Sequence, residues 1–130
     1  MRFYTKMPAS LQPFFKEALQ HYAVAMKEKD LHKAWSSLEK AHVIGQMYPY
    51  AHSLVHWKML VFGCRIKSLK EVLGQIPRLL LGGVKSFVGT VPVGNTGGAN
   101  IPPMKSLPID PAIQEIFTKA GVKWYLHKTS

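Results

Sequence analysis

The sequence predicts an all-α protein: a compact bundle of two helical hairpins, followed by a long Gly/Asn/Pro loop and a short C-terminal helix. Three observations predict this fold class. Apolar residues recur at spacings of three and four in successive segments, which marks one buried helical face in each. Capping residues or prolines stand where these segments begin. The Gly/Asn/Pro-rich stretch 89–110 cannot continue a helix, so it separates the last short helix from the others.

The first predicted hairpin contains helices at about 10–29 and 31–46. Ser10 and Asp30 are suitable N-caps, and proline is tolerated in the first turn of a helix. The two predicted apolar faces consist of Leu11, Phe15, Ala18, Tyr22 and Ala25, and of Ala34, Trp35, Leu38, Ala41 and Gly45.

The second predicted hairpin contains helices at about 50–67 and 69–88, after a turn at Met47-Tyr48-Pro49. Ser68 is the expected cap of the later helix, and Pro77 is expected to kink it or to begin a second segment. The predicted buried positions are Val55, Met59, Phe62 and Ile66, and then Leu69, Val72, Leu73, Ile76, Leu79, Leu80 and Val84.

The last predicted helix covers 111–120, where Asp110-Pro111 supplies a cap and a first-turn proline and Gly121 ends the helix. Its apolar face consists of Ile113, Ile116, Phe117 and Ala120. We expect the whole chain, 1–130, to form one domain. The two hairpins are weakly similar to tetratricopeptide repeats, but fewer than three units favour a compact bundle over a solenoid.

Composition limits the classes of protein. The chain has 130 residues with 47% hydrophobic content, and no apolar run reaches the roughly 18 residues of a membrane span. The N-terminus lacks the apolar core of a signal peptide, and a single cysteine, which we expect to fill the core, suits a reducing cytoplasm. The net charge of +10 leaves binding to a polyanion open, although the cations are scattered.

Three of the six histidines, His42, His52 and His56, fall on the helices that flank the Tyr48 turn. In an antiparallel hairpin with a rise of about 1.5 Å per residue, His42 is level with residue 54, midway between the other two. His52 and His56 are four residues apart and therefore share a face. We expect the three imidazoles to converge between the helices.

This histidine cluster is a candidate metal site. Glu39 lies three residues before His42 on the same face and is a candidate fourth ligand, while Gln46 and His21 could support the site. Imidazole with carboxylate suits zinc, iron, nickel or copper(II). The alternative is that these histidines are ordinary packed, hydrogen-bonded side chains at the border of an apolar face.

The string Gly94-Asn95-Thr96-Gly97-Gly98-Ala99-Asn100 lacks the features of a phosphate-binding loop. No Lys-Ser or Lys-Thr follows it, no strand is predicted before it, and Pro102-Pro103 prevents a helix from starting there. We expect its glycines to supply positive φ angles, and Asn95, Thr96 and Asn100 to tie the loop down. Such a strap could close over the histidine site.

The sequence resembles bacterial domain-of-unknown-function family 3703 over roughly 14–111. The residues that carry the resemblance are Leu38-Glu39-Lys40-Ala41-His42 with Gly45-Gln46, His52-x-x-x-His56 with Met59-Leu60, Glu71-Val72-Leu73-Gly74-Gln75, and Pro92 to Asn100. The resemblance implies a small bacterial cytosolic protein with genes often near metal or arsenic resistance systems, and it implies no activity. Lys40 replaces a usual arginine, and Leu107-Pro108-Ile109-Asp110 replaces a Met-Pro-Ile-Pro-like segment.

The sequence therefore favours a non-enzymatic, metal-binding helical protein with His42, His52 and His56 as ligands, and with Glu39 either as the fourth ligand or as a residue that supports the ligands. An interaction module whose basic surface binds a protein partner or nucleic acid is the alternative, and a homo-oligomer is left open. A metal-dependent hydrolase or oxygenase is a third hypothesis, which lacks an identifiable second catalytic group.

Overall fold

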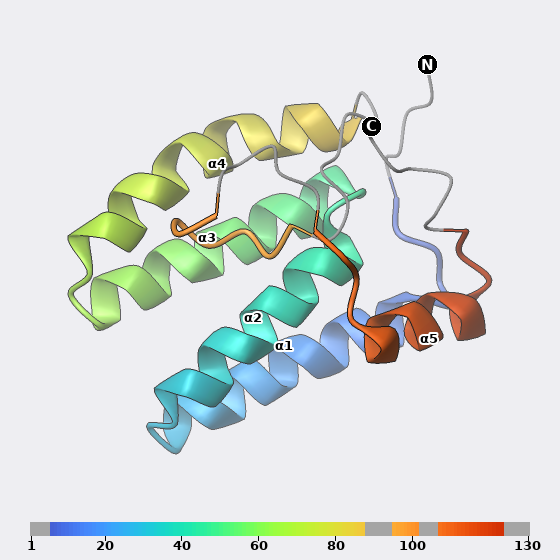
Figure 1. The fold of residues 1–130 in the computed structure, drawn as a ribbon, viewed down its shortest axis with the longest axis horizontal. Coiled ribbons are helices and arrows are strands. Elements are labelled where there is room, and N and C mark those ends of the chain that lie inside the picture. The colour runs from blue at the N-terminus through green and yellow to red at the C-terminus, as the bar shows by residue number, and fades with distance from the viewer. Residues whose placement is uncertain (1–5, 88–94, 102–106, 124–130) are drawn as a thin grey trace.

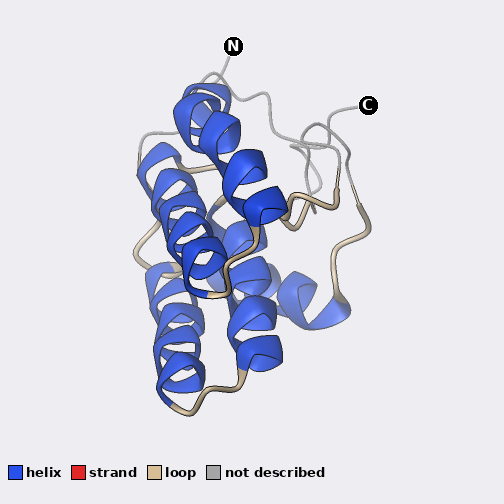
Figure 2. Ribbon diagram, turned by 90° about the vertical axis from the view of Figure 1, so that its left-hand side faces the viewer, coloured by secondary structure: helices blue, strands red, loops and turns tan. Residues whose placement is uncertain are grey.

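The computed structural model describes residues 6–87, 95–101 and 107–123, and in these ranges it contains five helices and no strand (Figures 1 and 2). This confirms the all-α fold class. In chain order the helices are α1 (Gln12–Lys27), α2 (Leu31–Gly45), α3 (Pro49–Arg65), α4 (Leu69–Phe87) and α5 (Pro111–Ala120).

The helices form two packed pairs, α1 with α2 and α3 with α4, as predicted (Figure 1). Contacts between α2 and α3 join the pairs, and α5 packs on α2. The segment 95–101, orange in Figure 1, returns from α4 to lie over the second pair. The hairpin between α2 and α3, which carries the three histidines, is therefore central in the molecule.

Three of the predicted helix caps are present. The Asp30 side chain accepts a hydrogen bond of 3.1 Å from the backbone N–H three residues later, and Ser68 Oγ accepts a similar bond of 3.3 Å. Asp110 accepts one of 2.8 Å from the backbone N–H two residues later, with Pro111 in the first turn. Each cap supplies an acceptor to an N–H that has no partner within its helix.

The predicted cap at Ser10 is wrong. The first helix begins at Gln12, with Leu11 at the N-cap position, because the carbonyl oxygen of Pro8 already accepts hydrogen bonds from the next turn. Ser10 Oγ instead donates a 2.7 Å hydrogen bond to the carbonyl oxygen of Ala120 at the end of α5. This residue therefore links the first and last described helices.

The core lies between the two helical pairs and under α5. The predicted face of α1 is buried throughout, and the predicted faces of α2 and α5 are buried except for partly exposed Trp35 and Ala120. Large side chains with almost no exposure are Leu11, Leu38, Ile44, Val55, Met59 and Phe117. Trp35 packs on Phe62, with ring centroids 5.2 Å apart, so the two pairs share this core.

The orientation of α4 differs from the prediction. Leu69, Leu73 and Ile76 were expected in the core, but they are 71%, 58% and 42% exposed, whereas Gln75 is fully buried. A Cβ on Gly63 of α3 would lie 3.2 Å from the Cβ of Glu71 and 3.3 Å from the Val72 side chain, so glycine at position 63 allows α4 to pack closely on this side. A single helix continues through Pro77 to Phe87, so no second segment begins there.

The end of α3 also departs from expectation. Cys64 is exposed and does not fill the core, and Ile66 is 38% exposed. Cys64 follows buried Phe62 by two positions, which is about 200° around a helix of 3.6 residues per turn and therefore on its opposite face. Within the described ranges, none of the helices combines the length and apolar content that crossing a bilayer requires.

Candidate metal centre

The three predicted histidines converge on one point. The Nε2 atom of His42 lies 3.0 Å from Nε2 of His52 and 3.0 Å from Nε2 of His56, and the last two are also 3.0 Å apart. All three side chains are buried, with exposures of 2%, 6% and 2%. The equal distances from His42 agree with its predicted level between the two histidines of α3.

Local sequence explains the convergence. Pro49 starts α3 immediately after Tyr48, which is extended, so α2 and α3 are joined by a very short turn. At the same end, a Cβ on Gly45 would lie 2.9 Å from the Phe15 ring and 3.0 Å from the Ala51 side chain. Glycine at position 45 therefore permits the close approach of helices that brings His42 to the face of α3.

The three Nε2 atoms are spaced as three ligand atoms on one side of a metal ion would be. With edges of 3.0 Å, an ion about 2.05 Å from each nitrogen would lie roughly 1.1 Å out of the plane, with N–metal–N angles near roughly 94°. These values suit three neighbouring positions of an octahedral ion or, after a small expansion, three corners of a tetrahedron. Among the described residues, these three are the group whose ligand atoms could hold one metal ion.

The outer ring nitrogens fix the protonation pattern. Nδ1 of His42 lies 2.7 Å from the backbone oxygen of Asn95, and Nδ1 of His56 lies 2.6 Å from Oε1 of Gln75. Because both partners are acceptors, each Nδ1 carries the proton and donates it. In the neutral ring, Nε2 then presents a lone pair to the centre of the triangle, which is the tautomer that binds a metal.

The orientation of the Gln75 amide is determined by its other contacts. Nε2 of Gln75 donates to Oε1 of Glu71 at 2.8 Å and to the backbone oxygen of Gly97 at 2.8 Å. With both amide protons used in this way, Oε1 must be the atom that faces His56. The acceptor for His56 is thus set by a network and not by one contact.

Burial keeps His42 and His56 neutral. Desolvation lowers the pKa of His42 well below its ordinary value of 6.5, and the neighbouring charges of His52 and His56 act in the same direction. Desolvation also lowers the pKa of His56 to about 4, with a smaller opposing effect of the hydrogen bond that His56 donates to Gln75 and a lowering effect of the Arg78 charge. At neutral pH the imidazoles of His42 and His56 are therefore available as metal ligands.

The segment 95–101 packs against the imidazole of His42. Gly97 has a φ of +86°, and a Cβ there would lie 2.6 Å from Cδ2 and 2.9 Å from Nε2 of His42. The Asn95 side chain accepts a 2.8 Å hydrogen bond from the Gly97 N–H and so stabilises this turn. Only glycine fits against the imidazole in that backbone conformation.

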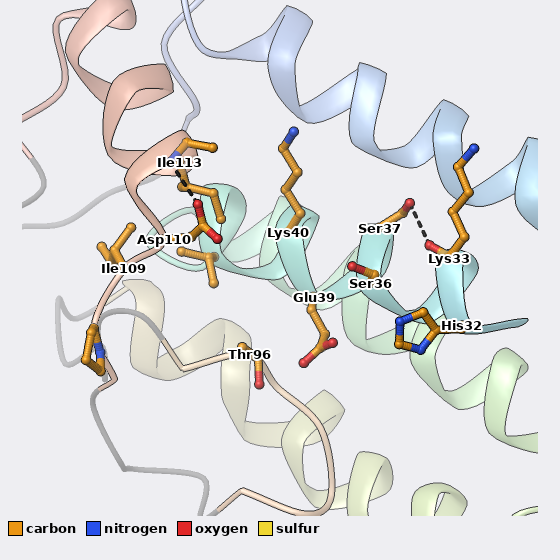
Figure 3. Close-up of a pocket in the computed structure, with 13 residues that line it drawn as sticks. His32, Lys33, Ser36, Ser37, Glu39, Lys40, Thr96, Ile109, Asp110 and Ile113 are labelled. Carbon is orange, nitrogen blue, oxygen red and sulfur yellow. Dashed lines mark hydrogen bonds between the residues drawn. The ribbon is translucent and has the colours of Figure 1, made fainter.

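Glu39, the predicted fourth ligand, is not a member of the three-histidine group. It is half-buried and lines a neighbouring pocket of about 470 Å³, which lies between α2, α5 and the strap (Figure 3). Burial raises the pKa of its carboxyl group, while a hydrogen bond with Thr96 lowers it. Figure 3 shows Glu39 and Thr96 pointing toward each other, with His32 beside them.

The remaining predicted residues lie at different distances from the cluster. Gln46 is buried at the end of α2, and Asn100 is an exposed residue of the strap. His21 is exposed, with Nε2 3.8 Å from the Glu17 carboxylate, and is not part of the group. His32 is exposed on α2, and His127 lies outside the described residues.

Gln75 contacts His56 directly, and Glu71 contacts Gln75. Neither residue was identified as a site residue from the sequence. Periodicity placed both on the polar side of α4, because a glutamine in a helix is usually solvated. The available signal was their spacing of four residues on one helical face, together with their place in a motif that resembles the family pattern.

Comparison with known proteins agrees with the resemblance. The model of the family described as "Protein of unknown function (DUF3703)" matches residues 9–117, so the chain belongs to this family. No curated protein and no solved structure matches the chain at a significant level.

Proposed function

We propose that this protein binds one transition-metal ion through Nε2 of His42, His52 and His56. The observation that carries the proposal is the triangle of buried Nε2 atoms 3.0 Å apart, in which the outer nitrogens of His42 and His56 donate to fixed oxygen acceptors. The proposal concerns binding and assigns no reaction.

A bound cation explains the arrangement better than hydrogen bonding among the rings does. Neutral His42 and His56 both direct lone pairs inward, and these nitrogens are 3.0 Å apart. A proton on Nε2 of His52 could lie along only one of its two edges, which leaves other lone pairs facing each other. Protonation of a second ring is opposed by burial, which lowers the pKa values of His42 and His56.

The donor set restricts the metal. Three imidazoles suit zinc, iron, nickel or copper(II), and they disfavour calcium, which prefers oxygen ligands. Because imidazoles are neutral ligands, the ion would keep its full charge in a buried site. Residence in the cytoplasm, where one cysteine can stay reduced, remains a prediction from the sequence.

The test is equilibrium binding of zinc, iron, nickel and copper(II), together with elemental analysis of the purified protein. We expect one ion per chain, and a stabilisation of about 2.7 kcal/mol when free metal is one hundred times its dissociation constant. His52→Ala should abolish most of this stabilisation, because two imidazoles cannot complete the face.

His32→Ala is the matched control, since His32 is exposed on α2 and outside the triangle. It should bind metal like the wild type. The proposal is wrong if the wild type gains no stability from any of the four metals, or if His52→Ala and His32→Ala bind metal equally well.

A further inference from the structure

A carboxylate on α4 joins the histidine cluster to the strap. Oε1 of Glu71 accepts hydrogen bonds from Nε2 of Gln75 at 2.8 Å and from the backbone N–H of Ala99 at 3.2 Å. One oxygen atom thus contacts both the side chain that orients His56 and the backbone of the segment that covers His42.

Gln75 connects the same elements a second time. Its oxygen accepts from His56 at 2.6 Å, and its nitrogen donates to the backbone oxygen of Gly97 at 2.8 Å. Gln75 is fully buried, so each of these bonds would be costly to leave unmade. The tautomer of His56 and the closure of the strap therefore depend on one network, whose charged member is Glu71.

We propose that Glu71 is a positioning residue of the metal site, which acts through Gln75 and Ala99 to hold His56 in its metal-binding tautomer and the 95–101 strap closed over the ion. This inference rests on the proposed function. It deepens that function by assigning control of metal affinity and metal release to a residue that does not touch the ion.

The packing of the strap on α4 supports the proposal independently of the hydrogen bonds. A Cβ on Gly74 would lie 2.4 Å from the Cβ of Ala99, so the strap sits directly on the helix backbone between Glu71 and Gln75. The strap is also fixed at its far end, where Arg78 donates a 2.6 Å hydrogen bond to the carbonyl oxygen of Ile101. A displaced strap would break the Ala99 and Gly97 contacts together.

The experiment measures metal affinity and the rate of metal release to an excess of chelator, with zinc or nickel as the probe. Glu71→Ala should weaken affinity by about 10- to 100-fold, as loss of partners of metal-bound histidines generally does, and should speed release. Glu71→Gln keeps an oxygen acceptor at the same place and should recover most of both. Glu115→Ala, which removes an exposed carboxylate on α5, should behave like the wild type.

A second variant covers the case in which Glu71→Ala does not fold. Gly74→Ala leaves every polar group in place and adds only the methyl group that would displace Ala99, and alanine favours a helix over glycine. It should also release metal faster than the wild type.

Wild-type release rates in folded Glu71→Ala, or in Gly74→Ala if the former is unfolded, would overturn the inference. Those results would leave the metal site itself intact, provided that the wild type binds and His52→Ala does not. Absence of binding in the wild type would instead overturn the proposed function.

Discussion

Gly97 combines a backbone conformation that favours glycine with a direct contact to a histidine of the candidate site. Its φ of +86° is disfavoured for other residues, and its Cα faces the His42 ring so closely that a methyl group would overlap the imidazole. Gly97 also donates its backbone N–H to the Asn95 side chain, and its carbonyl oxygen accepts a hydrogen bond from Gln75. The strap can therefore cover the histidines only with glycine at this position.

Substitution of Gly97 should reveal both effects. Gly97→Ala should lower the free energy of unfolding by more than the roughly 1–2 kcal/mol that a positive φ alone costs alanine, and it should weaken metal binding. Gly121→Ala is the matched control, because Gly121 has a φ of +72° with nothing within 4 Å of an added Cβ. Urea unfolding measures the free energy of unfolding of both variants. Equal decreases in Gly97→Ala and Gly121→Ala would contradict the described contact with His42.

The pH dependence of the metal-free protein follows from the lowered histidine pKa values. The pKa of His56 is about 4 in the folded protein and near 6.5 when unfolded, so the unfolded chain takes up the proton first as pH falls. The free energy of unfolding therefore carries no penalty from His56 above pH 6.5, and it falls by roughly 3 kcal/mol as the pH is lowered from 6.5 to 4. His42 acts in the same direction.

Urea unfolding of metal-free protein at pH 7.5 and pH 4.5 measures this loss. His56→Asn should shrink the difference between the two pH values, because it removes a buried imidazole with a lowered pKa. An undiminished difference in His56→Asn would show that His56 is not kept neutral by burial.

The three histidines could be located from the sequence because their levels along the two helices depend only on helix geometry. Residue counting from the Tyr48 turn places His42 between His52 and His56, whatever the surrounding side chains are. Glu39 shares the helical face of His42, but its hydrogen bond with Thr96 lies on the pocket side of the strap, and sequence spacing cannot show this. The partners on α4, Glu71 and Gln75, could not be predicted for a different reason, which is the orientation of that helix.

The element that sequence reasoning placed least well is α4. Its periodicity is strongly amphipathic, yet the stripe that contains Leu73 faces solvent and the face that contains Gln75 packs on α3. Burial of the polar face is favourable here because His56, Glu71 and the strap supply a partner for each polar atom of Gln75. These partners come from distant parts of the chain, so a local pattern cannot predict them.

The orientation of α4 predicts that an apolar residue in place of Gln75 destabilises the protein more than a polar residue in place of Leu73 does. Gln75→Leu, which adds an apolar side chain of similar size to the core, should lower the free energy of unfolding by at least about 2 kcal/mol, because it removes the partners of His56 Nδ1 and of the Gly97 carbonyl oxygen and one of the two hydrogen bonds to Glu71 Oε1. Leu73→Gln, which removes an apolar side chain at a 58% exposed position, should change it by less than about 0.5 kcal/mol. Chemical denaturation of both variants would contradict this orientation if Leu73→Gln were the more damaging.

At the scale of the whole molecule, the histidine cluster is the point where both hairpins and the strap meet. His42 comes from the first pair, His52 and His56 come from the second, and residues 95–101 cover them. The all-α class, the paired helices and the α5 boundaries follow from caps and periodicity. The path of the strap does not, since it is determined by contacts with Gly74 and Gly97 that form only in the folded chain.

X-ray absorption spectroscopy of the zinc- or nickel-loaded protein tests the central claim most directly. We expect three imidazole nitrogens at about 2.0–2.1 Å from the ion, and the loss of one imidazole in a His42→Ala variant loaded at a metal concentration high enough to offset its weaker binding. A first shell of oxygen ligands with fewer than three imidazoles, unchanged in His42→Ala, would contradict it.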